Sequence, residues 1–192
     1  MDTGRTQVLA DTGCTGGIVL GNTFQGPGII DNRIGDRLQQ GFNLSQAPKE
    51  EPGAIVVDDA TSGDAFKTTG DWYIGKGGGD YAGVLHWAKK GAGEATAAWQ
   101  PTLPEAGTYA VYTWYGGDPY ANHATDAPFT VEYKKDAETL TKKFSVNLKE
   151  HSGEWQLLGE FPFEAGKSVI VSVTNAANDN VVADAVKFVK VK

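Results

Sequence analysis

The sequence predicts an all-β protein, an antiparallel β-sandwich of jelly-roll type with an extended N-terminal segment packed against it. Three observations indicate this fold class: apolar and polar residues alternate over short stretches, 25 glycines and 8 prolines fall mostly between those stretches, and 40% of the residues are hydrophobic. Alternation with a period of two is typical of strands that bury one face. Frequent glycine and proline favour many turns between short elements.

The first fifty residues differ in character from the rest. The polar stretch SQAPKEEPG (residues 45–53) marks a boundary, so we expect an N-terminal segment over 1–50 and the sandwich over 54–192. Within the segment, GGIVLGNTFQG (residues 16–26) resembles one coil of a right-handed parallel β-helix. This resemblance implies the tail of an upstream β-helix domain. The alternative is an extra pair of strands packed on the sandwich.

Nine strands are predicted beyond residue 53, each an alternating run between turn residues. Nine strands with short turns favour a sandwich or jelly roll. In chain order they are Ala54–Asp58, Gly83–Ala88, Ala95–Gln100, Gly107–Tyr115, Ala127–Lys134, Thr141–Asn147, Gln156–Phe163, Ser168–Thr174 and Val182–Val191.

The stretch WQPTLPEAGTYAVYTWY (residues 99–115) places five aromatic rings around a proline and glycine turn. Alternation along the strand assigns Trp99, Tyr109 and Tyr112 chiefly to the sheet interior. Tyr115 lies where the strand gives way to GGDPY, so we expect this ring to reach a ligand.

Charge and motifs exclude several classes of function. The formal net charge is −7 with acids and bases interspersed, which disfavours a nucleic-acid partner. No apolar run approaches the roughly 18 residues of a membrane span, so no membrane partner is expected. The three histidines lack metal-ligand spacing and no nucleophile elbow is present. We therefore predict no catalytic residues and no required cofactor.

Asp184 stands in the apolar stretch VVADAVKFV (residues 181–189) and is expected to be buried. A buried carboxylate without partners costs several kcal/mol. One explanation is that Asp184 accepts backbone amides or pairs with a basic side chain. The other is a structural Ca²⁺ ion shared with Asp58 and Asp59, since Ca²⁺ prefers carboxylate and carbonyl oxygens.

Sugar binding requires exposed aromatic faces beside groups that hydrogen-bond hydroxyls. Residues of both kinds fall in or beside the predicted loops. The candidates are Trp72, Tyr73, Tyr81, Tyr115, Asp118, Tyr120, Asn122, Asn178 and Asn180.

Six separated blocks resemble the golvesin C-terminal-like domain, also described as a xanthan-lyase-type C-terminal domain, over about residues 54–190. They are VVDD, TTGDW, GAGEATAAWQPTLPEAGTYAVYTWY, NHATDAPFTVEY, SGEWQLLGEFPFEAG and NDNVVADAVKFV. The resemblance implies a β-sandwich of carbohydrate-binding-module type without catalytic residues.

The resemblance also implies a setting for the domain. Such modules are attached to secreted or cell-surface bacterial enzymes, so the expected partners are a polysaccharide or cell-wall glycan and an upstream catalytic domain such as a polysaccharide lyase or glycoside hydrolase. A second hypothesis is a structural or oligomerisation cap that binds no ligand. A third is a small polysaccharide hydrolase or lyase.

Overall fold

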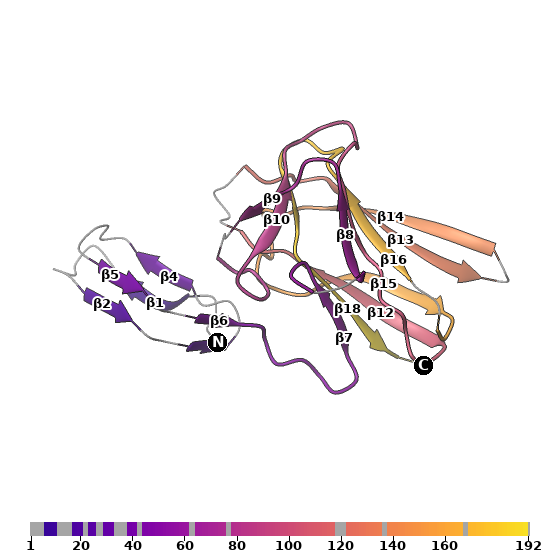
Figure 1. The fold of residues 1–192 in the computed structure, drawn as a ribbon, viewed down its shortest axis with the longest axis horizontal. Helices are drawn as coiled ribbons and strands as arrows, with labels where there is room; N and C mark the ends of the chain where they lie inside the picture. The colour runs from indigo at the N-terminus through magenta and orange to yellow at the C-terminus, as the bar shows by residue number, and fades with distance from the viewer. Residues whose placement is uncertain are drawn as a thin grey trace.

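The structure is a computed structural model that describes residues 6–10, 17–20, 23–25, 29–32, 38–41, 44–61, 64–75, 78–117, 122–135, 138–166 and 169–191. All regular elements in these ranges are strands (Figure 1), which confirms the predicted all-β class. Within the same ranges no helix is long and apolar enough to cross a membrane.

Two antiparallel sheets form the sandwich, with a smaller sheet beside them (Figure 1). The five-stranded sheet runs in the order β14 (Glu138–Val146), β13 (Ala127–Lys135), β16 (Ile170–Thr174), β11 (Thr96–Trp99) and β8 (Phe66–Thr69). The four-stranded sheet runs β15 (Gln156–Phe163), β12 (Gly107–Trp114), β18 (Ala185–Lys190) and β7 (Ile55–Asp58). The small sheet runs β17 (Val181–Ala183), β10 (Leu85–Ala88) and β9 (Tyr73–Gly75).

The predicted strands are present, with two differences. The last predicted strand is divided at Asp184, so that β17 and β18 belong to different sheets. Strands β8 and β9 were not expected from the pattern, because their side chains are mostly exposed and show no apolar alternation. Both lie at sheet edges, where backbone pairing to a neighbour defines the strand.

The core lies between the inner faces of the two large sheets. Trp99 is fully buried, and its ring stacks on Phe129 with centroids 6.2 Å apart. Tyr109 from the opposite sheet is also buried, and its hydroxyl donates to the carbonyl of Glu105 in the LPEAG turn. Four rings of the 99–115 stretch, those of Trp99, Tyr109, Trp114 and Tyr115, are buried and serve as scaffold. Truncating a buried aromatic side chain to alanine costs about 3–5 kcal/mol. The prediction for Tyr112 was wrong, because this residue is only half-buried and has the Lys187 ammonium 5.2 Å from its ring centre.

Six short strands precede the sandwich and pair only with one another among the described residues. They are β1 (Thr6–Ala10), β2 (Gly17–Leu20), β3 (Thr23–Gln25), β4 (Ile29–Asn32), β5 (Leu38–Gly41) and β6 (Leu44–Gln46). Strand β1 pairs with β4, β2 with β5 and β3 with β6, all in parallel.

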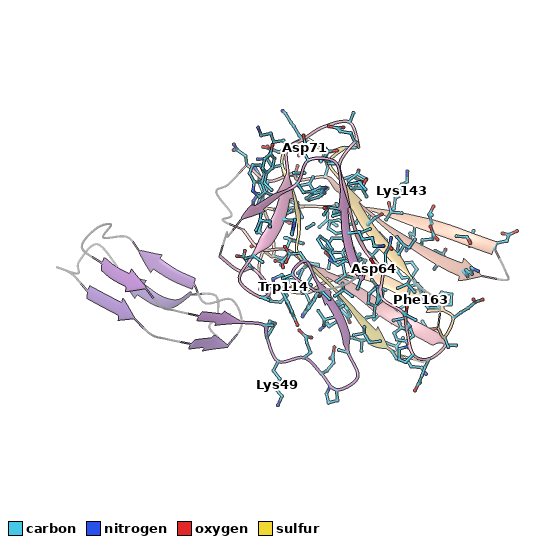
Figure 2. The ribbon with its side chains drawn as sticks, viewed as in Figure 1. Lys49, Asp64, Asp71, Trp114, Lys143 and Phe163 are labelled. Atoms are coloured by element: carbon cyan, nitrogen blue, oxygen red, sulfur yellow. The ribbon has the colours of Figure 1, made fainter. Side chains whose placement is uncertain are left out.

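The segment that joins these strands to β7 is fixed to the sandwich. The carboxylate of Glu50 accepts hydrogen bonds from the Tyr81 hydroxyl and from Nε1 of Trp155, each at 3.1 Å. The buried Lys187 ammonium lies 3.0 Å from the same carboxylate and 3.2 Å from that of Glu51. Figure 2 shows Trp114, which contacts Tyr81 and Trp155, on the side of the sandwich where residues 47–54 pass.

Candidate functional site

Strand pairing gathers three carboxylates at one end of the four-stranded sheet. Asp58 ends β7, Asp59 follows it, and Asp184 stands in the break between β17 and β18. The antiparallel register places Asp58 opposite Ala185, next to Asp184. One carboxylate oxygen from each of the three residues lies within 4.8 Å of the others.

Asp184 has fixed hydrogen-bond partners despite its complete burial. Its carboxylate accepts the backbone N–H of Tyr81 at 3.1 Å and of Gly116 at 3.1 Å. The Gly116 backbone approaches so closely that a Cβ there would lie 2.4 Å from Oδ1 of Asp80. Glycine is therefore required at position 116. The two N–H groups confirm the first explanation for the burial of Asp184, that its carboxylate accepts hydrogen bonds from backbone amides.

The local electrostatics oppose full ionisation of the cluster. Burial, and after it the neighbouring Asp59 charge, raise the pKa of the Asp58 carboxyl to about 6. Burial likewise raises the pKa of Asp184 well above its usual range, with Asp59, Asp58 and the buried Asp80 adding repulsion. Negative charges this close in a poorly hydrated site need a counter-charge or a proton.

The donor set fits a calcium ion. Two oxygens that each lie about 2.4 Å from one Ca²⁺ are at most about 4.8 Å apart, and the Asp58, Asp59 and Asp184 oxygens lie within this limit of one another. Oδ1 of Asp58 and Oδ1 of Asp59 are buried without a hydrogen-bond partner. His86 holds the other Asp59 oxygen through Nδ1 at 2.6 Å, as outer partners of metal-ligating carboxylates do.

A second site is a shallow depression of about 230 Å³ between the loops at one end of the sandwich. Figure 2 shows Asp71 of this site at the upper end of the molecule. Residues from three separate loops and from β9 line the depression. They are Gly70, Asp71, Tyr73, Lys89, Lys90, Glu94, Ala95 and Asn175.

An aromatic pair stands at this depression. Tyr73 is 42% exposed, and its ring stacks on Trp87 with centroids 4.7 Å apart and planes at 28°. The two residues are direct partners of the β9 and β10 register, which fixes the stack. Lys89 places its ammonium 5.8 Å from the centre of the Tyr73 ring. One ring face is therefore held rigidly beside exposed charged groups.

The far wall of the depression is braced internally. The Glu94 carboxylate accepts the N–H of Ala92 at 2.7 Å and the side-chain amide of Asn175 at 3.1 Å. The buried Asn175 oxygen in turn accepts the N–H of Gly93 and of Ala95. These bonds hold the β10–β11 loop against the loop after β16. Asp71, Lys89, Lys90 and Glu94 are the exposed charged groups of the depression that a ligand can meet.

The structure separates the predicted aromatic candidates. Tyr73 lies in the depression, and Trp72 beside it is half-buried, with Nε1 donating to the carbonyl of Thr69. Tyr81 and Tyr115 are buried, at 6% and 1% exposure, so the expectation that they lie at the surface is corrected.

Both tyrosines can be buried because each hydroxyl finds a hydrogen-bond acceptor inside the protein. That of Tyr115 donates to the carbonyls of Asn147 and Glu150, and that of Tyr81 donates to Glu50. Tyrosine can therefore end a strand and still point inward.

The predicted polar candidates do not gather at the depression. Asn178 binds the 125–126 turn, because its side chain accepts from the Thr125 N–H and donates to the Thr125 hydroxyl. Asn180 forms a bridge with His123, next to the exposed Asn122. Asp118 and Tyr120 lie outside the described residues.

Sequence reasoning missed several residues of the two sites. The glycine-rich stretch GKGGGD (residues 75–80) matches no site motif in the sequence, yet the Gly79 carbonyl accepts a hydrogen bond from Nε1 of Trp114 and Asp80 is buried beside the carboxylates. His86 has no metal-ligand spacing in the sequence, yet it binds Asp59. Lys89 and Lys90 gave no signal, because exposed lysines in turns are ordinary.

Comparisons with known proteins agree with the architecture. The golvesin C-terminal domain family model matches residues 55–190. A xanthan lyase of Bacillus sp. (strain GL1) is 32% identical over 72% of this chain, and the match spans 15% of that enzyme. The structure of Paenibacillus xanthan lyase matches with a TM-score of 0.64 at 30% identity, over 72% of this chain and 13% of that one.

A more distant likeness concerns the fold alone. A family 35 carbohydrate-binding module from an environmental isolate matches at a TM-score of 0.50 and 17% identity, over 71% of this chain and 93% of the module. This chain spans only a small part of the curated relative that it matches. With the family model matching most of its length, the chain belongs to the golvesin C-terminal domain family.

Proposed function

We propose that this domain is a non-catalytic accessory module that binds a polysaccharide or cell-wall glycan at the depression beside Tyr73. The observation that carries the proposal is the half-exposed Tyr73 ring, held by stacking on Trp87 next to Asp71, Lys89 and Lys90. An aromatic face packs against the apolar face of a sugar ring, while ammonium and carboxylate groups hydrogen-bond its hydroxyls.

The shape of the site favours a polymer as ligand. Its volume of about 230 Å³ lies below the roughly 300–1,000 Å³ of pockets that enclose drug-sized molecules. A shallow site between loops instead accommodates one or two rings of a longer chain that passes over it.

The placement of the acids supports a non-catalytic role. Glycoside hydrolysis needs two carboxyl groups that flank an accessible bond, about 5–10 Å apart. Asp59 and Asp184, which lie close together, are 5% and 0% exposed, so a polymer cannot reach them. The hypothesis of a small hydrolase or lyase therefore receives no support from this cluster.

The test is binding by affinity electrophoresis through gels that contain xanthan, laminarin or solubilised peptidoglycan, followed by titration calorimetry on any polymer that retards the protein. A sugar covers one ring face, roughly a quarter of the 150–250 Å² that an aromatic side chain buries. At about 25 cal/mol/Å² this is about 1.2 kcal/mol, so Tyr73→Ala is expected to weaken Kd about eightfold.

Ile74→Ala is the matched control. Ile74 is the next residue of β9 and is 71% exposed, but it does not line the depression. Equal losses for Tyr73→Ala and Ile74→Ala would contradict binding at this site. Absence of retardation in all three polymers would count against glycan binding.

We further propose that Asp58, Asp59 and Asp184 hold a structural Ca²⁺ ion. The support is that one oxygen of each residue lies within 4.8 Å of the other two, together with the two buried carboxylate oxygens that lack hydrogen-bond partners. Such an ion would tie β7 to the break between β17 and β18. Its expected effect is on stability, because two of the three carboxylates are buried and the ion would join separate strands.

The setting of the domain is also proposed. Its relative is a xanthan lyase of which the match covers a small part. This supports an upstream catalytic domain in a secreted or cell-surface protein. The ion pairs of Lys187 with Glu50 and Glu51 favour a second role for the domain, that of a structural cap that holds the preceding segment in place.

A further inference from the structure

The six strands before the sandwich repeat one arrangement twice. Gly17 pairs with Leu38 and Thr23 with Leu44, a constant offset of 21 residues, and Leu9 pairs with Asp31 at an offset of 22. All three pairs are parallel. The chain thus traces β1, β2 and β3 once and then lays β4, β5 and β6 alongside them in the same order.

Only a winding backbone satisfies these pairings together. Two parallel strands need a crossover of about a dozen residues or more, which is usually a helix. Here the crossover from β1 to β4 consists of β2 and β3, and each of these strands pairs in parallel with its own equivalent one turn later. The six strands between residues 6 and 46 therefore form two stacked coils with three sides each.

Each coil has an open edge, because among the described residues β1, β2 and β3, like β4, β5 and β6, each pair on one side only. The chain runs from β6 into the segment that is fixed to the sandwich, so the edge of β1, β2 and β3 is the one that a preceding coil would cover. A strand edge with free N–H and C=O groups is a template for a further strand. The edges of β1, β2 and β3 follow one another around the coil axis. A single segment that pairs with all three must therefore wind around the same axis in the same direction.

Coil number and sequence point to the same occupant. In repeat architectures each unit contacts only its neighbours, and at least about three units are needed for stability. The two coils described here fall short of that number. In the sequence, an asparagine stands immediately before β3 and another immediately before β6, at Asn22 and Asn43. The asparagine therefore recurs at the same 21-residue offset as the paired strands β3 and β6.

We propose that the open edge of β1, β2 and β3 is an interaction surface for a preceding coil of the same kind, supplied by a longer form of this polypeptide. Residues 6–46 are then the last two coils of an upstream parallel β-helix, and the sandwich follows that domain directly. The occupant is a segment of about 21–23 residues with three short strands. This inference is independent of glycan binding by the sandwich.

The test adds one coil to the full chain. A copy of residues 6–28 is inserted before Thr6, which keeps every loop length of the first coil. The control insert has the same length but carries proline in place of the copied Val8 and Val19, since proline cannot donate to a ladder. Hydrogen exchange of both proteins and of the unextended chain is followed by mass spectrometry, and light scattering gives their oligomeric state.

We expect amides of the inserted strands to exchange at least tenfold more slowly than those of the proline insert, and amides of β1–β3 to slow by a similar factor relative to the unextended chain. Exchange of the insert at the rate of an unfolded peptide would overturn the proposal. A stable dimer of the unextended chain with β1–β3 already protected would also overturn it, because the edge would then join two copies.

Discussion

The sharpest prediction concerns the buried carboxylates and the substitution Asp184→Asn. At about 4.8 Å and an effective dielectric constant of about 20, two ionised carboxylates repel by about 3.5 kcal/mol. Without a cation the cluster avoids this energy by binding protons, consistent with the raised pKa values of Asp58 and Asp184. A divalent cation removes the repulsion, so Ca²⁺ is expected to stabilise the folded state.

The size of the effect follows from linkage. Ca²⁺ at about 100 times its Kd stabilises the folded state by about 2.7 kcal/mol. For a domain of this size 1 kcal/mol shifts Tm by about 3–5 °C, so the melting temperature is expected to rise by about 8–13 °C between EDTA and saturating Ca²⁺. Differential scanning calorimetry measures the shift, and the luminescence of Tb³⁺ gives a binding readout at room temperature.

Asp184→Asn separates the metal from the hydrogen bonds. An amide oxygen in the position of Oδ2 still accepts the N–H of Tyr81 and of Gly116. In EDTA the variant is therefore expected to melt within about 3 °C of the original protein, since the amide keeps both hydrogen bonds and carries no charge for Asp58 and Asp59 to repel. In Ca²⁺ it is expected to gain almost nothing and to lose the Tb³⁺ signal.

The matched control is Asp64→Asn, which removes a charge whose side chain is 97% exposed, next to the start of β8 (Figure 2). This control is expected to gain as much from Ca²⁺ as the original protein. Equal melting temperatures of the original protein in EDTA and in Ca²⁺ would refute the reasoning. An undiminished gain in Asp184→Asn would refute the assignment of that residue as a ligand.

Three further predictions test the fold around the sites. Lys187→Met is expected to lower stability by about 1–3 kcal/mol and to speed hydrogen exchange over residues 47–54, because the Glu50 carboxylate loses its ammonium partner. Recovery in the double variant with Glu50→Gln would identify the ion pair as the cause, and unchanged exchange over 47–54 would contradict this role. Tyr115→Phe is expected to lower the free energy of unfolding in urea by about 1–2 kcal/mol and to leave glycan affinity unchanged, since the hydroxyl binds two carbonyls inside the protein. A loss of glycan affinity without a loss of stability would instead indicate that Tyr115 binds the ligand. Gly70→Ala is expected to lower the free energy of unfolding by more than about 1 kcal/mol, because the φ of 75° is unfavourable for alanine and the new Cβ would lie 2.6 Å from a backbone carbonyl oxygen. Gly53→Ala is the control for backbone strain alone, because Gly53 has a φ of 84° but no atom within 4 Å of the new Cβ.

The sequence by itself determined the all-β class and most strand positions. Alternation along 156–163 follows directly from burial of one strand face, so a local pattern reports it. Strand 107–114 is buried on both faces, and its apolar and aromatic residues identify it instead. The sequence also indicated that Asp184 would be buried and would need backbone amides, a basic side chain or a Ca²⁺ ion shared with Asp58 and Asp59. An acid inside an apolar run has few other solutions, because an isolated buried charge is too costly.

Only the tertiary structure decided which residues meet. Tyr73 and Trp87 stack because β9 and β10 pair, although β9 has no apolar alternation from which to predict it. Tyr115 stands at a strand end in sequence, yet it turns inward because carbonyls from a distant loop satisfy its hydroxyl. A strand pattern reports burial of its own face, whereas a site depends on register and loop contacts between segments distant in the chain.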